Sequence, residues 1–390
     1  MERVYLDYAA TTPVHPEVIE AMIPFFREKF GNASSLYSFG QETRGALEEV
    51  RQRTADFIGA APEEIIFTSG GSESNNMALK GIAWTARERG GRILVSAVEH
   101  HAVSEPAAFL KKQGFEMVRI PVDGQGVVDL DFIRREIDKK PLLVSVMHAN
   151  NEIGVVQPVA EIGRLCRERE VVFHTDAVQT VGHLPVSVRE LNADLLSCSA
   201  HKLYGPKGIG FLYVRRGIRL SPLIHGGDQE RRRRAGTENL PAIVGLGKAL
   251  EIAGREMEAE GVRLTGYRDR LIDGLLKKVP DCRLNGDRDR RLPNNVNISF
   301  AYVEGESVLL NLDFEGIAVS TGSACTSSSL EASAVLLAIG VPAELAHGSI
   351  RITMGKWTTE AELDRILEAL PRVVAKLRAM SPLYPGGKNG

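Results

Sequence analysis

Short apolar segments alternate with longer stretches of helical periodicity along the first half of the chain. The apolar segments carry Val, Ile and Leu on both faces, which is typical of parallel strands covered by helices on each side. We interpret as strands the residues 65–67, 93–95, 142–146, 171–173 and 195–199, and as helices 74–89, 104–113, 129–138 and 159–168. The alternation predicts an α/β fold with a doubly wound sheet.

The second half of the chain indicates a further domain. With 390 residues the chain is long for one domain. After Pro241 a charged helical stretch without further Pro runs to about residue 278. It would lead into strands at 295–300 and 316–320 and a terminal helix at 360–378. We predict a large domain over 14–258 and a small domain that combines 1–13 with 259–390.

Composition excludes several classes of protein. Lys and Arg number 48 and Asp and Glu 50, so no net field favours nucleic acid or an anionic membrane. No apolar run reaches the roughly 18 residues of a membrane span, and the first residues lack the apolar region of a signal peptide. The four Cys residues are far apart without a CxxC pair, so we expect no disulfide framework or metal site, and a cytoplasmic location.

In doubly wound sheets, ligands bind beyond the carboxyl ends of the strands. The strand at 65–67 is followed by Thr-Ser-Gly-Gly-Ser and a helix, and this combination of glycines, hydroxyl groups and a helix N-terminus suits an anion. A glycine turn with a serine N-cap explains the same residues. His100 follows the next strand, where it could stack on a flat ligand or transfer protons, or be a structural histidine.

Three more polar positions follow the remaining strands. Asn150 and Asn151 could hold a carboxylate or an aromatic oxygen, or be turn residues. Asp176 ends an apolar strand, so its carboxylate needs a cation to offset desolvation, unless it caps a helix. Lys202 follows a buried strand, where desolvation lowers the pKa of the amine and favours imine formation.

Asp176 and Lys202 are 26 residues apart, about one βαβ unit, so adjacent strands would bring them to one ligand. Pyridoxal phosphate (PLP) needs a lysine for its aldehyde, a carboxylate for its ring nitrogen, an anion site for its phosphate and a flat group over its ring. The strand ends supply all of these, and together they predict PLP as the cofactor.

The sequence resembles the cysteine desulfurases of the NifS/IscS type (group I), in the class V aminotransferase superfamily. The resemblance runs from Tyr5 to Tyr384. Its most specific segments are Gly-Asn-Ala-Ser-Ser at 31–35, Thr-Ser-Gly-Gly-Ser-Glu-Ser-Asn-Asn at 68–76, Asn-Asn-Glu-Ile-Gly-Val-Val-Gln at 150–157, Ser-Ala-His-Lys at 199–202, Arg-Ala-Gly-Thr-Glu-Asn at 234–239 and Ser-Thr-Gly-Ser-Ala-Cys at 320–325. It implies fold type I of the PLP-dependent enzymes, with a mixed, mostly parallel sheet flanked by helices and a smaller α+β domain.

The resemblance also implies a role for each matching residue. Lys202 would bind the PLP aldehyde, Asp176 would pair with the ring nitrogen and Gln179 would contact the ring hydroxyl. His100 would stack on the ring and shuttle protons. The phosphate would be held by Gly71, Ser72, Ser199, His201 and Thr237, the last from a partner subunit. Asn151 and Arg351 would hold the substrate carboxylate.

Cys325 is the nucleophile that the resemblance implies, on a loop at about 320–333. Its neighbours are small and polar and cannot pack a core, which favours a reactive thiol over a structural one. Cys198, within an apolar strand, fits a structural role.

The implied reaction converts L-cysteine to L-alanine and leaves a persulfide on Cys325. The sulfur would pass to an iron–sulfur scaffold protein or to tRNA thiolation. No resident metal is expected, and Cys325 would contact an iron–sulfur cluster only during transfer. A homodimer is expected, because the Thr237 loop suits an interface. Alternatives are a selenocysteine lyase or aminotransferase of the same fold, and a non-enzymatic binding protein.

Overall fold

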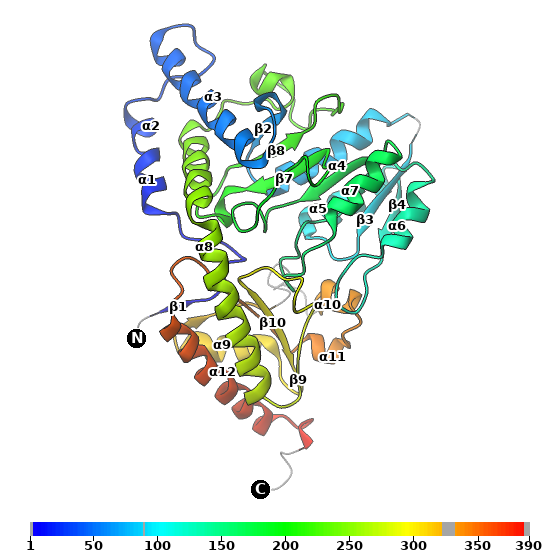
Figure 1. Cartoon of the computed structure of the whole chain (residues 1–390), viewed down its shortest axis with the longest axis vertical. Helices are drawn as coiled ribbons and strands as arrows, with labels where there is room; N and C mark the ends of the chain where they lie inside the picture. Colours follow the sequence, from blue (N-terminus) through cyan, green and yellow to red (C-terminus); the bar gives the residue numbers. More distant parts are fainter. Residues whose placement is uncertain (1–2, 89, 322–331, 386–390) are drawn as a thin grey trace.

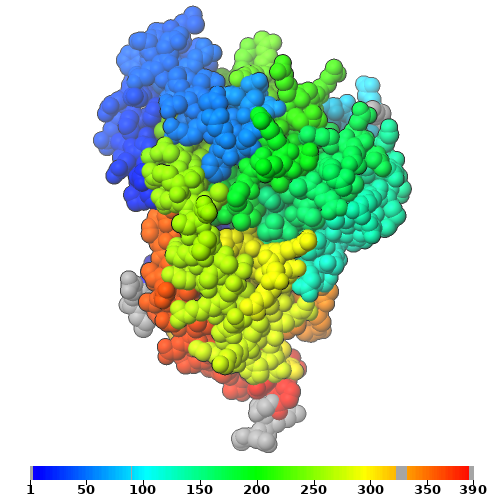
Figure 2. Space-filling view, in the orientation of Figure 1, coloured from blue at the N-terminus to red at the C-terminus, as the bar shows by residue number. Residues whose placement is uncertain are grey.

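The computed structural model describes residues 3–88, 90–321 and 332–385. Two lobes are joined by one long helix, α8 (Leu240–Lys278), which runs along both of them (Figure 1). In the space-filling view the yellow-green α8 lies at the surface of each lobe in turn (Figure 2). No helix in the described ranges is both long and apolar enough to cross a membrane.

The larger lobe contains a seven-stranded sheet in the order β2-β8-β7-β6-β5-β3-β4. Its strands are β2 Ile65–Thr68, β3 Arg92–Ser96, β4 Glu116–Ile120, β5 Leu143–Ser145, β6 Val172–Asp176, β7 Leu195–Ser199 and β8 Gly210–Val214. The run from β7 to β4 is parallel, and β8 is antiparallel to both of its neighbours. The mixed, mostly parallel sheet is confirmed.

Helices cover both faces of this sheet, as the apolar segments predict. Successive residues of β2 point to opposite cores: Ile65 and Phe67 pack on one face and Ile66 on the other. The first face is covered by α3 (Ser38–Ile58), α6 (Leu130–Ile137), α7 (Val159–Glu168) and the first part of α8. The second face is covered by α4 (Gly71–Thr85) and α5 (His101–Lys112).

The smaller lobe is built on an antiparallel sheet in the order β12-β10-β9 and on a parallel pair, β1 with β11. Its strands are β1 Val4–Tyr5, β9 Cys282–Leu284, β10 Asn295–Phe300, β11 Ile317–Ala318 and β12 Ser349–Thr353. Its helices are α9 Gly305–Phe314, α10 Ala334–Ala338, α11 Ala343–Ala346 and α12 Glu360–Met380. The N-terminal strand therefore belongs to the same lobe as the C-terminal third of the chain.

Helix α8 belongs to two apolar cores. Its residues as far as Ile252 pack into the core of the large lobe, and those from Leu264 onward pack into the core of the small lobe. The boundary predicted between residues 258 and 259 falls in the stretch between these cores. The division of the chain at that point stays a prediction.

The N-terminal segment leads from the small lobe to the large one. After β1 it runs beside the segment 201–204, where the N–H groups of Thr12 and His15 donate to the carbonyls of His201 and Tyr204. It then enters α1 (Pro16–Met22) and α2 (Pro24–Arg27) before α3. Short 3₁₀ helices complete the described elements: η1 Pro62–Glu64, η2 Ala200–Lys202 and η3 Gln229–Arg232. Of these, η2 follows β7 directly and carries Lys202.

Candidate active site

A cavity of about 340 Å³ lies beyond the carboxyl ends of β6 and β7, where an open α/β sheet binds its ligands. It is lined by residues of both lobes, among them Ala9, Ala10 and Arg351 from the smaller one. The structure brings ten of the predicted site residues to this cavity: Gly71, Ser72, His100, Asn151, Asp176, Gln179, Ser199, His201, Lys202 and Arg351.

Asp176 lines the cavity at the end of β6, where it is only 4% exposed. Its Oδ2 accepts a hydrogen bond from Asn75 Nδ2 at 2.6 Å, and its Oδ1 accepts one from the backbone N–H of Val178 at 2.9 Å. Burial raises the pKa of Asp176, while these hydrogen bonds oppose the rise. A cation placed against this carboxylate would offset the cost of its burial.

Lys202 reaches the cavity from η2, which follows β7, the strand next to the one that Asp176 ends. Residue pairing places Asp176 opposite Ser197 on β7, so η2 begins three residues beyond the end of β6. The amine of Lys202 donates to the backbone oxygen of Ala10 at 2.8 Å and to that of Ala9. The carbonyl of Lys202 accepts from His183 Nε2 at 2.8 Å. Both ends of this lysine are therefore positioned by backbone or side-chain contacts.

His100 is the N-cap of α5. Its Nδ1 accepts a hydrogen bond from the backbone N–H of Ala102 at 3.0 Å, which leaves the proton of the neutral ring on Nε2. Burial is the largest influence on the pKa of His100 and lowers it. A neutral imidazole with a defined tautomer suits both stacking and proton transfer.

The predicted anion site lies at the N-terminus of α4, a helix of 15 residues that begins at Gly71. The preceding Gly70 has a φ of 145°, which only glycine adopts readily. A Cβ on Gly71 would lie 2.8 Å from Val178 Cγ2, so the close approach of the backbone here requires glycine. The free N–H groups of the first helical turn suit a phosphate.

Arg351 lies on β12, on the opposite side of the cavity. Its Nη1 donates to the backbone oxygen of Asn151 at 3.0 Å, and its Nη2 pairs with Asp7 Oδ1 at 2.8 Å. Its buried Nε has no hydrogen-bond partner among the described residues. An unsatisfied buried donor on a fixed guanidinium suits a carboxylate ligand.

Two predicted residues are not placed at the cavity. Thr237 is exposed in the segment between η3 and α8 and does not line it. Cys325 lies outside the described residues. In the described part of the chain no cluster of three or more His, Cys, Asp or Glu side chains is arranged to hold a metal ion.

Asn75 is a site residue that the sequence analysis missed. It is 1% exposed, and its Oδ1 has no hydrogen-bond partner in the part of the chain that the structure describes. The missed signal is spacing, because Asn75 follows Gly71 by four residues and so lies on the same face of α4.

The residues of the cavity fit PLP. Asp176 offers a buried carboxylate to the ring nitrogen, and Lys202 offers an amine to the aldehyde. Gly71 begins the helix whose N-terminus would bind the phosphate, and no larger residue could replace Gly71 without displacing Val178. These residues belong to different elements of the fold, and all of them line one cavity of suitable size.

Comparisons with known proteins agree with this geometry. The aminotransferase class-V family model matches residues 4–366. The chain is 59% identical to the cysteine desulfurase IscS of Dictyoglomus turgidum over 97% of this chain and 96% of that protein. It is 54% identical to the cysteine desulfurase IscS of Methanosarcina thermophila over 98% of this chain and 94% of that protein.

Solved structures give the same result. A NifS-like protein superimposes with a TM-score of 0.91 at 39% identity, covering 96% of this chain and 100% of the other. SspA in complex with cysteine superimposes with a TM-score of 0.81 at 35% identity, covering 91% of this chain and 100% of the other. The chain therefore belongs to the class-V aminotransferase family and, within it, to the cysteine desulfurases of the IscS/NifS type.

Proposed function

We propose that this protein uses PLP to remove sulfur from L-cysteine, releases L-alanine and keeps the sulfur as a persulfide on Cys325. The observation that carries this proposal is the convergence of Lys202, Asp176 and Arg351 on one cavity. Two of these residues suit the cofactor and the third suits the carboxylate of an amino acid. The structure of the similar protein SspA in complex with cysteine supports the choice of substrate.

Lys202 would bind the aldehyde of PLP, Asp176 would pair with its ring nitrogen and Gln179 would contact its ring hydroxyl. The phosphate would be bound by Gly71, Ser72, Ser199, His201 and the partner subunit's Thr237. When bound, PLP supplies an electron-withdrawing ring that weakens the bonds at the Cα of an amino acid.

Arg351 and Asn151 would orient the substrate by its carboxylate. Because Asp7 and the carbonyl of Asn151 already fix the guanidinium of Arg351, little conformational freedom is lost when the substrate binds. His100 would donate the proton on its Nε2 to the reacting amino acid, since its Nδ1 accepts a hydrogen bond from the N–H of Ala102. Burial lowers the pKa of the imidazole and so favours the neutral ring, in which Nε2 carries that proton.

The thiolate of Cys325 would attack the sulfur of the bound cysteine. An S–S bond forms as the C–S bond of the substrate breaks, and the electron pair of that bond stays on carbon, which is protonated to give alanine. The persulfide would then pass to an iron–sulfur scaffold protein or to tRNA thiolation. The three cysteines that the structure describes, Cys166, Cys198 and Cys282, are free thiols, which is compatible with a reducing cytoplasm.

Incubation with L-cysteine followed by mass spectrometry of the intact protein tests this function. We expect an adduct with the mass of one sulfur atom that maps to Cys325 and disappears in Cys325→Ala. Cys282→Ala, which removes the half-buried thiol of the small lobe, is the control and should keep the adduct. An adduct-free protein that still consumes L-cysteine would favour an aminotransferase instead.

A further inference from the structure

The backbone that follows Lys202 has an unusual conformation. Tyr204 has a φ of 63°, in the left-handed region that bulky residues rarely occupy unless their surroundings hold them there. Its N–H donates to Thr12 Oγ1 at 2.9 Å, and its carbonyl accepts from the N–H of His15 at 2.9 Å. Two bonds to the N-terminal segment therefore fix this turn, directly after the lysine that reaches the cavity.

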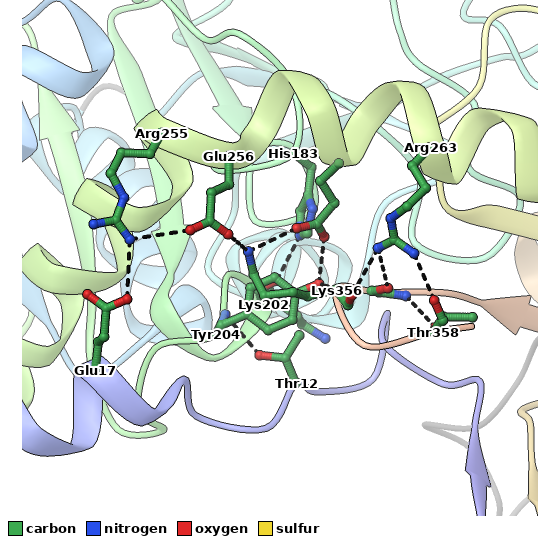
Figure 3. Close-up of polar contacts among 12 residues, drawn as sticks. Thr12, Glu17, His183, Lys202, Tyr204, Arg255, Glu256, Arg263, Lys356 and Thr358 are labelled. Carbon is green, nitrogen blue, oxygen red and sulfur yellow. Dashed lines mark hydrogen bonds and ion pairs between the residues drawn. The ribbon is translucent and has the colours of Figure 1, made fainter. Parts of the chain in front are cut away.

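The hydroxyl of Tyr204 connects the turn to two other segments (Figure 3). It donates to Glu260 Oε1 at 2.8 Å and accepts from the backbone N–H of Lys356 at 2.7 Å. Burial raises the pKa of Tyr204 well above its ordinary value, so the hydroxyl keeps its proton for Glu260. Glu260 lies in the middle of α8, and Lys356 lies between β12 and α12.

The side chain of Lys356 also contacts Tyr204 and carboxylates of α8, so that Tyr204, Glu256, Glu260 and Lys356 form one cluster. Its Nζ pairs with Glu260 at 3.2 Å and with Glu256, and lies 5.3 Å from the centre of the Tyr204 ring. The side chains of Lys356 and Glu260 are 13% and 12% exposed, so solvent screens their interaction little. Figure 3 shows Glu256 extending from α8 toward Lys356.

This cluster joins the two segments that carry the opposite sides of the cavity. Tyr204 is two residues from Lys202, and Lys356 is five residues from Arg351 on the chain that leaves β12. Lys202 belongs to the large lobe and Arg351 to the small one, so their separation depends on how the lobes are held. A displacement of about 1 Å between reacting groups costs on the order of a hundredfold in rate.

We propose that Tyr204 and Lys356 form a positioning contact that holds Lys202 at a fixed place relative to Arg351. This inference rests on the proposed function, since it needs Lys202 to bind PLP and Arg351 to bind the substrate. Neither Tyr204 nor Lys356 touches the reacting atoms. They act by keeping the amine and the guanidinium at the spacing that one cofactor and one amino acid require.

The N-terminal segment provides a second link, because Ala10 contacts Lys202 and Asp7 contacts Arg351. Loss of the Tyr204 contact alone should therefore weaken the positioning rather than abolish it. Tyr204→Phe keeps the ring and removes both hydroxyl bonds. We expect it to raise KM for L-cysteine and to slow imine formation with added PLP, each by about tenfold.

The matched control is Tyr267→Phe. Tyr267 lies on α8, the helix that carries Glu260, and packs against the core of the small lobe. The guanidinium of Arg263 lies 5.2 Å from its ring. The Tyr267→Phe variant should leave KM for L-cysteine and the rate of imine formation unchanged. If Tyr204→Phe only lowers the melting temperature while imine formation and KM match those of Tyr267→Phe, the contact is merely structural and the inference is wrong.

A second pair of variants covers the case in which Tyr204→Phe does not fold. Lys356→Met removes the ammonium between the two glutamates but keeps the backbone N–H, and Lys356→Arg keeps the charge. We expect the first to raise KM several-fold and the second to restore it; equal KM values for both would overturn the inference. If the unmodified protein forms no imine with PLP, the proposed function itself fails, so the two failures are distinguishable.

Discussion

At the scale of single residues, the chemistry of the site depends on one buried carboxylate. Asp176 follows from the sequence, because an acidic residue at the end of an apolar strand demands a partner. Asn75 was missed, because its four-residue spacing from Gly71 indicates a role only once α4 is known to pack against the end of β6. The sequence indicates which residues carry reactive groups but not which neighbours adjust them.

Asn75→Ala should shift the pH dependence of catalysis. The amide of Asn75 stabilises the charged form of Asp176, so its loss raises the pKa of that carboxyl further. We expect the acidic limb of the kcat/KM profile to move up by about one pH unit. Asn76→Ala, which removes an amide that donates to the carbonyl of Ser72, is the control. An unshifted limb, or one at lower pH, would contradict this account of Asp176.

The buried carboxyl of Glu152 should make the stability of the protein depend on pH. Burial raises its pKa to about 7, although Ser333, which donates to it at 2.5 Å, and Arg351 oppose the rise. A carboxyl with a raised pKa favours the folded state at low pH, and this contribution is lost as the pH rises from about 4.5 to about 7.

Glu152→Gln should remove that dependence. Across this range the unfolding free energy of the native protein should fall by about 3 kcal/mol relative to the variant. Urea denaturation of both proteins at pH 4.5 and pH 8 measures the difference. A constant difference between the two pH values would show that Glu152 is not buried as a neutral acid.

At the scale of elements, five strands of the large sheet were predicted correctly, including the edge strand β2. β4 and β8 were missed, β8 although it is apolar and buried along its whole length. The five predicted strands of the large sheet correspond to β2, β3, β5, β6 and β7. β4 escaped prediction because it is an edge strand with exposed Glu116 and Arg119. α4 begins at Gly71, earlier than predicted, because glycine is a poor helix former and hides the first turn.

That first turn of α4 can be tested by adding one methyl group. Gly71→Ala places a Cβ 2.8 Å from Val178 Cγ2 and should weaken PLP binding at least several-fold, because the helix N-terminus must shift. Gly266→Ala in α8 is the control, since its Cβ would meet nothing within 4 Å and should add about 1 kcal/mol of stability. Fluorescence titration with PLP measures the affinity, and equal Kd values for both variants would contradict the proposed phosphate site.

At the scale of the whole molecule, the sequence predicts two lobes, but the contacts between subunits do not follow from the pattern of one chain. Periodicity reports which faces are buried and not what buries them. Several large apolar side chains are exposed in the N-terminal region. They lie on α1, α2, the start of α3 and the residues that join these helices: Ile19, Ile23, Phe26, Phe30, Leu36, Tyr37 and Phe39. Such a surface is typical of an interface.

We expect the protein to be a homodimer that buries this surface. Sedimentation equilibrium should give twice the mass of the chain, and Phe30→Glu combined with Leu36→Glu should shift the equilibrium toward the monomer. The predicted phosphate ligand Thr237 would then be lost from the partner's site, so PLP affinity should fall with dissociation. A monomeric native protein with full PLP occupancy would contradict the dimer and the role of Thr237.

The central claim is that Lys202 binds PLP in this cavity. Borohydride reduction of the PLP-supplemented protein, followed by peptide mass spectrometry, tests it most directly. We predict one reduced pyridoxyl label, on Lys202, and its loss in Lys202→Ala but not in Lys207→Ala. An unlabelled protein, or a label that maps to another lysine, would contradict the account.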